Sequence, residues 1–507
     1  MVFLTLGAKL CGMFRDMLIA SNYATGNDAI AFFTASRIPI LLFDVIIGGV
    51  ISSTFIPVFN EYLERRDEKG AFRFANNYVN LVLLITVIIT VFGILFHKGL
   101  INLMAPELDS ATKELAGVLS NIMFPMVIFT GLAFSMVGLL QSYGEYNIPS
   151  MMSFVSNLII IIYFFTFGTR FGIKGLAVAM LIGWSSQILI QIPWLRKFGY
   201  RYRPSMEFRS EGIQKAARLA LPMLISTWVQ PLCSIITMRL ASGIDGGRAI
   251  PALEYANKLY IIVVGVFTFV VTNLIFPYLS RAGASGDTER VKKLTSKSLK
   301  SVALVILPVM ATTFVLATPI VKLIYQRGNF TENDVPLTAA ALSFYTIGML
   351  GNGFLEVLNK SFFAGQNSKT PMKTAILSML VNIALSYILA KAMGIGGLAL
   401  AVAASACVNA GLNMFYLHKQ RGRLFEKEDF LDFAKMAVSA AVMGVVIYIV
   451  YRCLPALANT SLDKICKVAV PCAAGFIAYG ILILLTRVSE GRELIKIFMK
   501  TGKGGTK

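Results

Sequence analysis

The chain has 507 residues, of which 56% are hydrophobic and only 15% are charged, and its mean hydropathy is +0.69. This composition excludes an ordinary soluble protein and is typical of a helical protein that crosses a membrane many times. A net charge of +20 would suggest nucleic acid as the partner of a soluble protein, but here the placement of the basic residues matters more.

The first two apolar stretches carry five charged residues: Lys9, Arg15, Asp16, Arg37 and Asp44. A charge at the middle of a membrane-spanning helix costs at least about 2.5–3.5 kcal/mol. These charges therefore need a polar cavity or each other, and we interpret the hairpin as lining a water-filled path for an anionic substrate. Because Arg15 and Asp16 are adjacent, they point about 100° apart on a helix, and we expect them to face different partners.

With about 20 apolar residues for each crossing, the chain predicts about fourteen spans. The first six lie near residues 2–20, 31–58, 77–97, 116–142, 149–169 and 174–195. The next six lie near 216–241, 251–279, 301–326, 337–364, 371–392 and 396–417, and a last pair near 430–453 and 465–486.

Basic residues concentrate in alternate connections, namely those after the second, sixth, eighth and twelfth spans and the segment after Arg487. The intervening connections hold few Lys or Arg residues and several acids, such as Glu107 and Glu332. By the positive-inside rule, this pattern predicts that both termini are cytoplasmic. The same pattern explains the net charge, so we expect no nucleic-acid partner.

An internal repeat relates spans 1–6 to spans 7–12. GIKGLAVA at 172–179 recurs as GIGGLALA at 394–401, and Pro149 recurs as Pro371, both at an offset of 222 residues. The Phe-Ile-Pro that ends span 2 has its counterpart in Ile-Phe-Pro at 275–277, and Arg37 has its counterpart in Lys258. Since six is even, both copies have one orientation, which is a parallel repeat suited to alternating access around a central cavity.

The predicted fold is therefore an all-α polytopic membrane protein with about fourteen transmembrane helices in two six-helix lobes. The first lobe covers 1–196 and the second 216–417. An additional helix pair covers 430–487, and a basic cytoplasmic tail covers 488–507. The pair lies outside the repeat, either as a stabilising addition or as a lateral surface for a lipid chain.

Signals of enzymatic chemistry are missing. The terminal GKGGTK lacks the spacing of a phosphate-binding loop, and the six cysteines and two histidines show no metal or disulfide spacing. We expect a transporter without a cofactor or metal, in which the intramembrane charges are the functional residues. Arg37 and Lys258, one from each lobe, would suit a phosphate or pyrophosphate, because Arg binds such groups bidentately and Lys as a point charge. The alternatives are snorkelling to the headgroups and internal ion pairs.

Several stretches resemble the signature of the MurJ/MviN family of lipid II flippases. They are KLCGMFRDMLIA, NDAIAFFTASRIPILL, GGVISSTFIPVFNEY, FPMVIFTGLAFSMVGLLQSYGEYNIP, LEYANKLY, LIFPYLSRA, IYQRGNFT and NSKTPMKTA, and they cover about residues 1–420 in order. The resemblance implies two six-helix lobes around a cavity. It also implies flipping of a lipid-linked peptidoglycan precursor to the outer leaflet of the bacterial cell membrane, with a lipid-tail groove along spans 13 and 14.

The resemblance assigns the substrate site residue by residue. Arg15 and Asp16 match the Arg-Asp of the family's first span, and Asp28 matches the acid of its NDA or TDA motif. Lys9 stands where the family often has Arg, and Arg37 stands at the basic position before the motif's proline. The partners implied are the lipid-linked precursor, membrane lipids and the cell-wall synthesis machinery.

The chain departs from the family pattern at several positions. Lys258 lies in YANKL where the family usually reads YADRL, so Asn257 replaces an acid. Phe43 stands where many members carry a cavity arginine, and Gly48 where some carry glutamate. A sodium site known in some members would place acids at Thr237 and Ser386, so we predict no such site.

These departures keep three alternatives open. The first is a flippase for another lipid-linked oligosaccharide, such as a capsule, teichoic-acid or exopolysaccharide unit. The second is a cation-coupled drug exporter, which the basic cavity disfavours because cationic drugs require acids. The third is a scaffold of the wall-synthesis complex, which leaves the buried charges unexplained.

Overall fold

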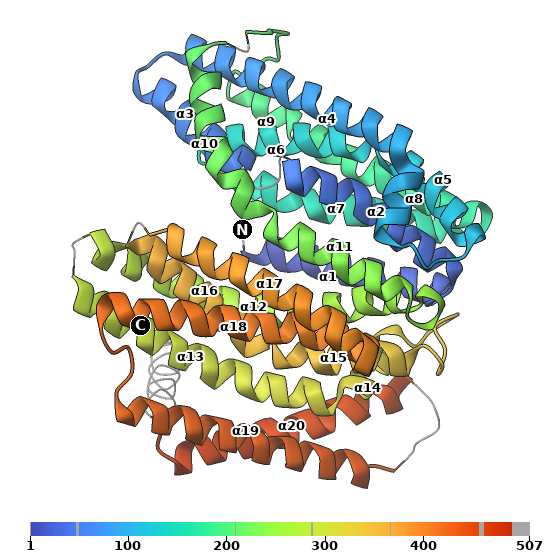
Figure 1. The fold of residues 1–507 in the computed structure, drawn as a ribbon, viewed down its shortest axis with the longest axis vertical. Coiled ribbons are helices and arrows are strands. Elements are labelled where there is room, and N and C mark those ends of the chain that lie inside the picture. Colours follow the sequence, from blue (N-terminus) through green and yellow to red (C-terminus); the bar gives the residue numbers. More distant parts are fainter. Residues whose placement is uncertain are drawn as a thin grey trace, which may run out of the picture. The chain divides into compact units, whose positions relative to one another are not determined.

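The structure, a computed structural model, describes residues 2–46, 50–207, 209–284, 287–365, 367–455 and 461–488. Gly48 and all but the first residue of the predicted tail lie outside these ranges. Every regular element in them is a helix (Figure 1), so the predicted all-α class is confirmed. Contacts divide the chain into two compact units, Met1–Pro251 and Ala252–Lys507.

The first unit holds eleven α-helices and one short 3₁₀ turn among its described residues. They are α1 Val2–Tyr23, α2 Asn27–Ile46, α3 Val50–Glu64, α4 Glu68–Met104, α5 Ser110–Met123, α6 Met126–Ser142, α7 Asn147–Thr166, α8 Gly168–Leu189, α9 Ile192–Lys197, α10 Glu211–Thr227, α11 Val229–Ser242 and η1 Asp245–Gly247.

The long α12 begins at the end of the first unit and runs into the second. The helices from there are α12 Ala249–Ala284, α13 Thr288–Val315, α14 Ala317–Tyr325, α15 Val335–Ile347, α16 Met349–Ala364, α17 Lys369–Met393, α18 Ile395–Arg421, α19 Lys427–Cys453 and α20 Ser461–Leu485.

Local sequence explains where several of these helices begin. Asp67, Asp109 and Asp287 precede α4, α5 and α13, and each carboxylate accepts a hydrogen bond from a backbone N–H three residues further on, at 2.8–2.9 Å. Such caps satisfy N–H groups that the helix itself leaves open and are worth about 1 kcal/mol each.

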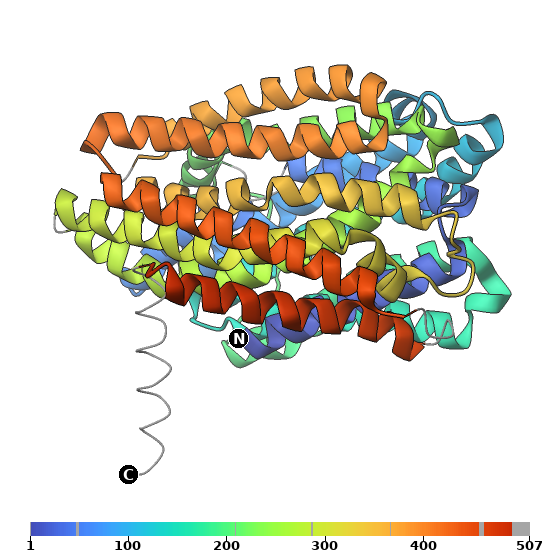
Figure 2. The ribbon, with the colours of Figure 1, turned by 90° about the horizontal axis from the view of Figure 1, so that it is seen from below.

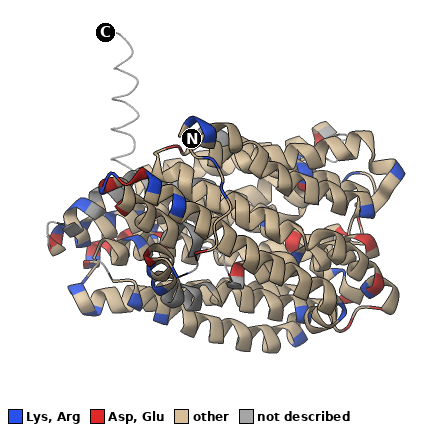
Figure 3. Ribbon diagram, turned by 90° about the horizontal axis from the view of Figure 1, so that it is seen from above, with Lys and Arg blue, Asp and Glu red and all other residues tan. Residues whose placement is uncertain are grey.

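Ten segments among the described residues are long and apolar enough to cross a membrane, if the α15–α16 pair, bent by 42°, is taken as one span. The four other predicted spans are helical too, as α1, α2 with α3, α10 with α11, and α12. A total of fourteen spans is therefore compatible with the structure. Figure 3 shows long uncharged middles in most helices, with Lys, Arg, Asp and Glu mostly near their ends.

Two equivalent glycines support the internal repeat at the level of the backbone. Gly172 has φ 53° and ψ −145°, and Gly394, 222 residues later, has φ 57° and ψ −130°. This combination is essentially restricted to glycine. Gly394 separates α17 from α18, which pack on each other, and Gly172 lies at a kink near the start of α8, which packs on α7.

Aromatic side chains form the core at one end of the first unit. Phe55 stacks on Phe59 and on Phe74 at centroid distances of 5.3 and 5.4 Å, and Tyr78 meets Phe55 edge to face. Thr54 and Tyr78 share a buried hydrogen bond of 3.0 Å between their hydroxyls. Large rings packed in this way hold α3 against α4.

Three asparagines on α4 hold the linker between α9 and α10. Asn76 accepts from the Tyr200 hydroxyl at 2.8 Å, Asn77 accepts from the Glu207 N–H at 3.1 Å, and Asn80 donates to the Ser205 carbonyl at 2.6 Å. All three asparagines are buried. We call residues 200–207 the clamped linker. Beyond it, α10 and α11 pack against α2, α3 and α4 within the first unit. The lobe boundaries that the repeat implies remain a prediction.

The last two helices, α19 and α20, pack on each other and on α13 and α14 of the second unit, and Figure 2 shows α19 and α20 side by side. Met436, Ala440, Met443 and Ile447 follow one face of α19 at helical spacing and are buried against α13. The Tyr479 hydroxyl of α20 donates to the Leu304 carbonyl at 3.0 Å.

Candidate functional site

Arg15 and Asp16 form a direct ion pair inside α1. Arg15 donates to Oδ1 of Asp16 from Nη2 at 2.6 Å and from Nε at 3.0 Å. The side chains are 19% and 7% exposed. The expectation that the two residues face different partners is therefore wrong. Their Cβ atoms diverge, but the arginine stem is long enough to bend back, and a poorly hydrated site strongly favours such pairing.

Asn157 on α7 completes this cluster. Its Oδ1 accepts from Nη1 of Arg15 at 2.8 Å, and its Nδ2 lies 3.5 Å from the Ala8 carbonyl of α1. A Cβ at Gly12 would come within 3.2 Å of Nδ2, so glycine there lets the two helices approach. We call Arg15, Asp16 and Asn157 the α1–α7 charge cluster. Within it, the guanidinium has all three of its nitrogens engaged.

Arg37 forms a second polar contact in the first unit. Its Nη2 donates to the Ser234 hydroxyl of α11 at 3.0 Å and thus ties α2 to α11. Asp44 lies seven residues further along α2, about two turns, so it shares a helix face with Arg37. Both side chains are partly exposed.

The other predicted site residues lie elsewhere. Lys9 is half-buried on α1, and Asp28 is exposed in the first turn of α2. Lys258 is half-buried on α12 in the second unit, whereas Arg37 belongs to the first. Of the six predicted residues, the structure thus joins Arg15 with Asp16. A shared cavity lined by Arg37 and Lys258 stays a prediction.

Phe43 belongs to the apolar core. It is 6% exposed and lies 5.9 Å from Phe134, measured between ring centroids. Its position is therefore a packed one, and an arginine side chain there would need a different local arrangement or a route to water.

Sequence reasoning missed Asn157 and Ser234. Asn157 did leave a signal, because it is an amide directly before the apolar run LIIIIYFF, inside a predicted membrane span. Polar groups inside membrane spans usually have a polar partner, so such a residue predicts a contact with another helix. Ser234 left none, because serine is common in membrane helices and often bonds only to its own backbone.

A neutral polar cluster occupies the second unit between α17 and α18. The Ser378 hydroxyl donates to the Ser405 carbonyl at 2.7 Å, and Nδ2 of Asn382 donates to the Ser405 hydroxyl at 3.1 Å. We call these three residues the α17–α18 polar cluster. Among the described residues, no group of three or more His, Cys, Asp or Glu side chains could hold a metal ion.

Comparisons with known proteins place these features in a family. A family model described as "Lipid II flippase MurJ" matches residues 19–484. The chain is 26% identical over 502 residues to the "Probable lipid II flippase MurJ" of Buchnera aphidicola from Acyrthosiphon pisum, covering 98% of this chain and 97% of that one. It is 29% identical to the protein of the same description from Vibrio cholerae, covering 87% and 86%.

Solved structures show the same fold. A structure described as "Lipid II flippase MurJ, inward closed conformation" superposes with a TM-score of 0.81 at 24% identity, covering 98% of this chain and 100% of that one. An inward-facing multidrug-resistance transporter of the MATE family superposes with a TM-score of 0.71 at 15% identity, covering 82% and 95%. On the strength of the family match across most of its length, the chain belongs to the lipid II flippase MurJ family, a family of membrane transporters rather than enzymes.

Proposed function

We propose that this protein is a flippase that carries lipid II, the undecaprenyl-pyrophosphate-linked peptidoglycan precursor, from the cytoplasmic to the outer leaflet of the bacterial cell membrane. Family membership and the descriptions of its relatives support this substrate. The single observation that carries the proposal is the α1–α7 charge cluster, because a buried ion pair in a membrane helix is expensive and needs a functional reason.

The cluster indicates how an anionic headgroup would be bound. Asp16 and Asn157 occupy the guanidinium of Arg15, so a pyrophosphate has to compete with Asp16 for the same donors. Arg37 and Lys258 would supply further positive charge. Partial release of Arg15 from Asp16 would couple substrate binding to the packing of α1 on α7.

Alternating access between two lobes is the mechanism that the parallel repeat supports. The distribution of Lys and Arg among the loops supports an orientation with both termini in the cytoplasm, in which the headgroup would enter from that side. The lipid tail would stay in the membrane along α19 and α20. The cell-wall synthesis machinery that consumes the precursor is the partner expected on the outer side.

Complementation tests the site. In a strain depleted of its own lipid II flippase, the Arg15→Ala variant should fail to restore growth, while the wild-type chain does. Arg65→Ala is the matched control, because that arginine forms an exposed ion pair with Glu61 at the end of α3. Both variants must be present in the membrane in equal amounts by immunoblot. Full rescue by Arg15→Ala would overturn the site.

A second candidate is a flippase for another lipid-linked oligosaccharide, favoured by the burial of Phe43 in the apolar core instead of a cavity arginine. Native mass spectrometry of the purified protein with lipid II and with a teichoic-acid or capsule precursor separates the two. Preferential retention of lipid II supports the first candidate, and preferential retention of the other lipid supports the second.

A further inference from the structure

Helix α12 has a partly exposed face and a buried face along residues 252–262 of the second unit. The partly exposed positions recur every three or four residues and are Glu254, Asn257, Lys258 and Ile261. Tyr255 and Tyr260 are 1% and 7% exposed and belong to the buried face. Because successive residues of an α-helix are about 100° apart, Tyr260 lies about 200° round the helix from Lys258. These two side chains therefore leave α12 on roughly opposite sides.

Two tyrosines attach the buried face of α12 to the other helices of the second unit. The Tyr255 ring lies 5.1 Å from that of Tyr325, the last residue of α14, measured between centroids, and the Tyr325 hydroxyl donates to the Tyr255 carbonyl at 3.1 Å. Further along α12, the Tyr260 ring lies 5.6 Å from the Tyr345 ring of α15. The Tyr260 hydroxyl also accepts a hydrogen bond from Nδ2 of Asn352 on α16.

Asn352 lies one turn after the break between α15 and α16. The two helices are bent by 42° at this break, and Gly348 is the residue between them. The backbone N–H and Nδ2 of Asn352 both donate to the Gly348 carbonyl, at 3.0 and 3.3 Å. Asn352 is therefore attached both to the bend and, through Tyr260, to α12.

Close packing holds the bend against α18. A Cβ at Gly348 would lie 2.8 Å from Cα of Ala403, and a Cβ at Gly351 would lie 2.8 Å from the backbone nitrogen of Cys407. Glycine at both positions lets the backbones of the two helices approach. The bend thus has a firm support on one side, from which Asn352 reaches α12.

Of the contacts that Tyr260 makes, the hydrogen bond is the one that fixes direction. Packing between apolar surfaces is non-directional and tolerates small rotations, whereas a hydrogen bond weakens steeply when its angle changes. A small rotation of α12 about its axis would swing the side chain of Lys258 on the opposite face.

We propose that Asn352 is a positioning residue for Lys258. Its hydrogen bond to Tyr260 sets the rotation of α12, and thereby the direction in which Lys258 is presented to an anionic headgroup. The inference rests on the proposed function, in which Lys258 is one of the cations that bind lipid II. It adds Tyr260 and Asn352, which neither the family resemblance nor the proposed site includes.

The test compares N352L and the double variant Y260F/N352L as full-length purified proteins. N352L deprives the buried Tyr260 hydroxyl of its donor, so its unfolding midpoint should fall, and it should retain about fivefold less lipid II in native mass spectrometry. The double variant removes both polar groups, so its unfolding midpoint should return most of the way to the wild-type value.

Lipid II retention by the double variant separates positioning from stability. It should stay about fivefold low, because the connection between the bend and α12 is still missing. Recovery of both the unfolding midpoint and the retention would show a purely structural role and overturn the proposal. If N352L does not fold, Y260F, which keeps the ring beside Tyr345, should show the same loss of retention.

S361A is the matched control on the same helix. The buried Ser361 hydroxyl shares a hydrogen bond of 2.9 Å with Thr295 and accepts one of 3.2 Å from Arg421, near the other end of α16. The variant should be less stable than the wild-type chain but retain the wild-type amount of lipid II. A loss of retention as large as that of N352L would overturn the proposal.

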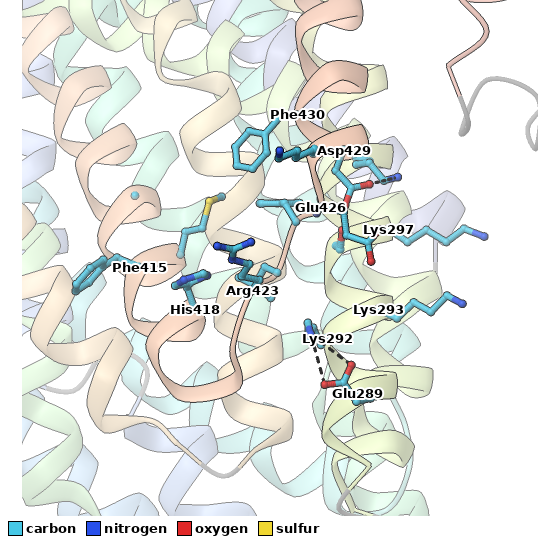
Figure 4. A pocket seen from close by; sticks show the side chains of 17 residues that line it. Glu289, Lys292, Lys293, Lys297, Phe415, His418, Arg423, Glu426, Asp429 and Phe430 are labelled. Carbon is cyan, nitrogen blue, oxygen red and sulfur yellow. Dashed lines mark hydrogen bonds and ion pairs between the residues drawn. The ribbon is translucent and has the colours of Figure 1, made fainter.

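Hydrogen–deuterium exchange gives a measurement that needs no substrate. Peptides from residues 252–262 should exchange faster in N352L and in the double variant than in the wild-type chain. The ends of α13, α18 and α19 form a cavity (Figure 4), and among its described lining residues none belongs to α12 or α16. Peptides from residues 415–430 at this cavity should therefore exchange at the wild-type rate.

The exchange results decide the inference separately from the proposed function. Unchanged exchange along 252–262 in the double variant, or equally faster exchange at the cavity, would overturn the positioning role. If the wild-type chain itself retains no lipid II, the proposed function fails, while faster exchange confined to α12 and the bend would still support the control of α12 by Asn352.

Discussion

The two copies of the repeat share a backbone plan but differ in what they bury. In the first, Asn157 of α7 accepts a hydrogen bond from Arg15, which is paired with Asp16 on α1. In the second, α17 meets α18 through the neutral α17–α18 polar cluster. Gly172 and Gly394 have nearly the same positive-φ backbone conformation in the two copies. The two copies therefore share the backbone conformation at these glycines, whereas these polar contacts involve charges in the first copy and neutral groups in the second.

Removing one member of the Arg15–Asp16 ion pair should have the largest effect on stability. Asp16→Ala leaves Arg15 buried without its counter-charge, which should lower the free energy of unfolding by about 3–5 kcal/mol. Thermal unfolding of the detergent-solubilised variant measures this. The double variant Arg15→Ala/Asp16→Ala should recover part of the loss, since it removes both charges. A double variant less stable than the sum of the two single changes contradicts the pairing.

Substitution of the two equivalent glycines, Gly172 and Gly394, should lower the stability by similar amounts. Gly172→Ala and Gly394→Ala each force a side chain into a backbone conformation that only glycine adopts easily, at a cost of about 1–3 kcal/mol. Nothing lies within 4 Å of a Cβ at Gly172, so the cost there is one of backbone conformation alone. Unfolding midpoints of the two variants should fall by similar amounts. If the unfolding midpoint fell in only one of the two variants, the two glycine positions would not be structurally equivalent.

Substitution of Asn157 should have a larger effect on stability and growth than substitution of Asn382. Asn157→Ala leaves a charged donor of Arg15 without its partner, which should cost about 1–3 kcal/mol and reduce complementation. Asn382→Ala, a comparable change on α17 in the second copy, removes one neutral hydrogen bond to Ser405 and should cost about 1 kcal/mol with growth unaffected. Equal loss of growth in both variants would mean that the charge has no special role.

The exposed ion pair of Lys322 with Glu332 should contribute least to stability. Lys322 and Gln326 hold the pKa of the Glu332 carboxyl below its usual range. Because the folded pKa is lowered, the contribution to stability is present above the ordinary glutamate pKa and is lost as the pH falls through the lowered value. As the pair is exposed, Glu332→Gln should cost at most about 0.5 kcal/mol near pH 7. Stability curves from pH 7 to pH 3 should converge for wild type and variant.

The sequence predicts the helices well because about 20 consecutive apolar residues have few structural alternatives in a membrane. It also predicts the repeat, since offsets of 220–222 residues recur in order. It does not predict the contacts of single side chains. The pairing of Arg15 with Asp16 depends on the bend of one long side chain, and that of Arg37 with Ser234 on how α2 meets α11. The spacing of apolar residues in the sequence predicts neither of these two contacts.

The clamped linker has a mechanical consequence. An irregular segment such as residues 200–207 would ordinarily be flexible. Here the asparagines of α4 and the ion pair of Arg73 with Glu207 hold it to the first unit. The chain just before α12 forms a short turn around Gly246 and Gly247, both with positive φ, and Arg248 at its end donates to the Thr25 hydroxyl at 3.1 Å. This turn, rather than the longest loop, is the joint through which motion of α12 would be passed along the chain.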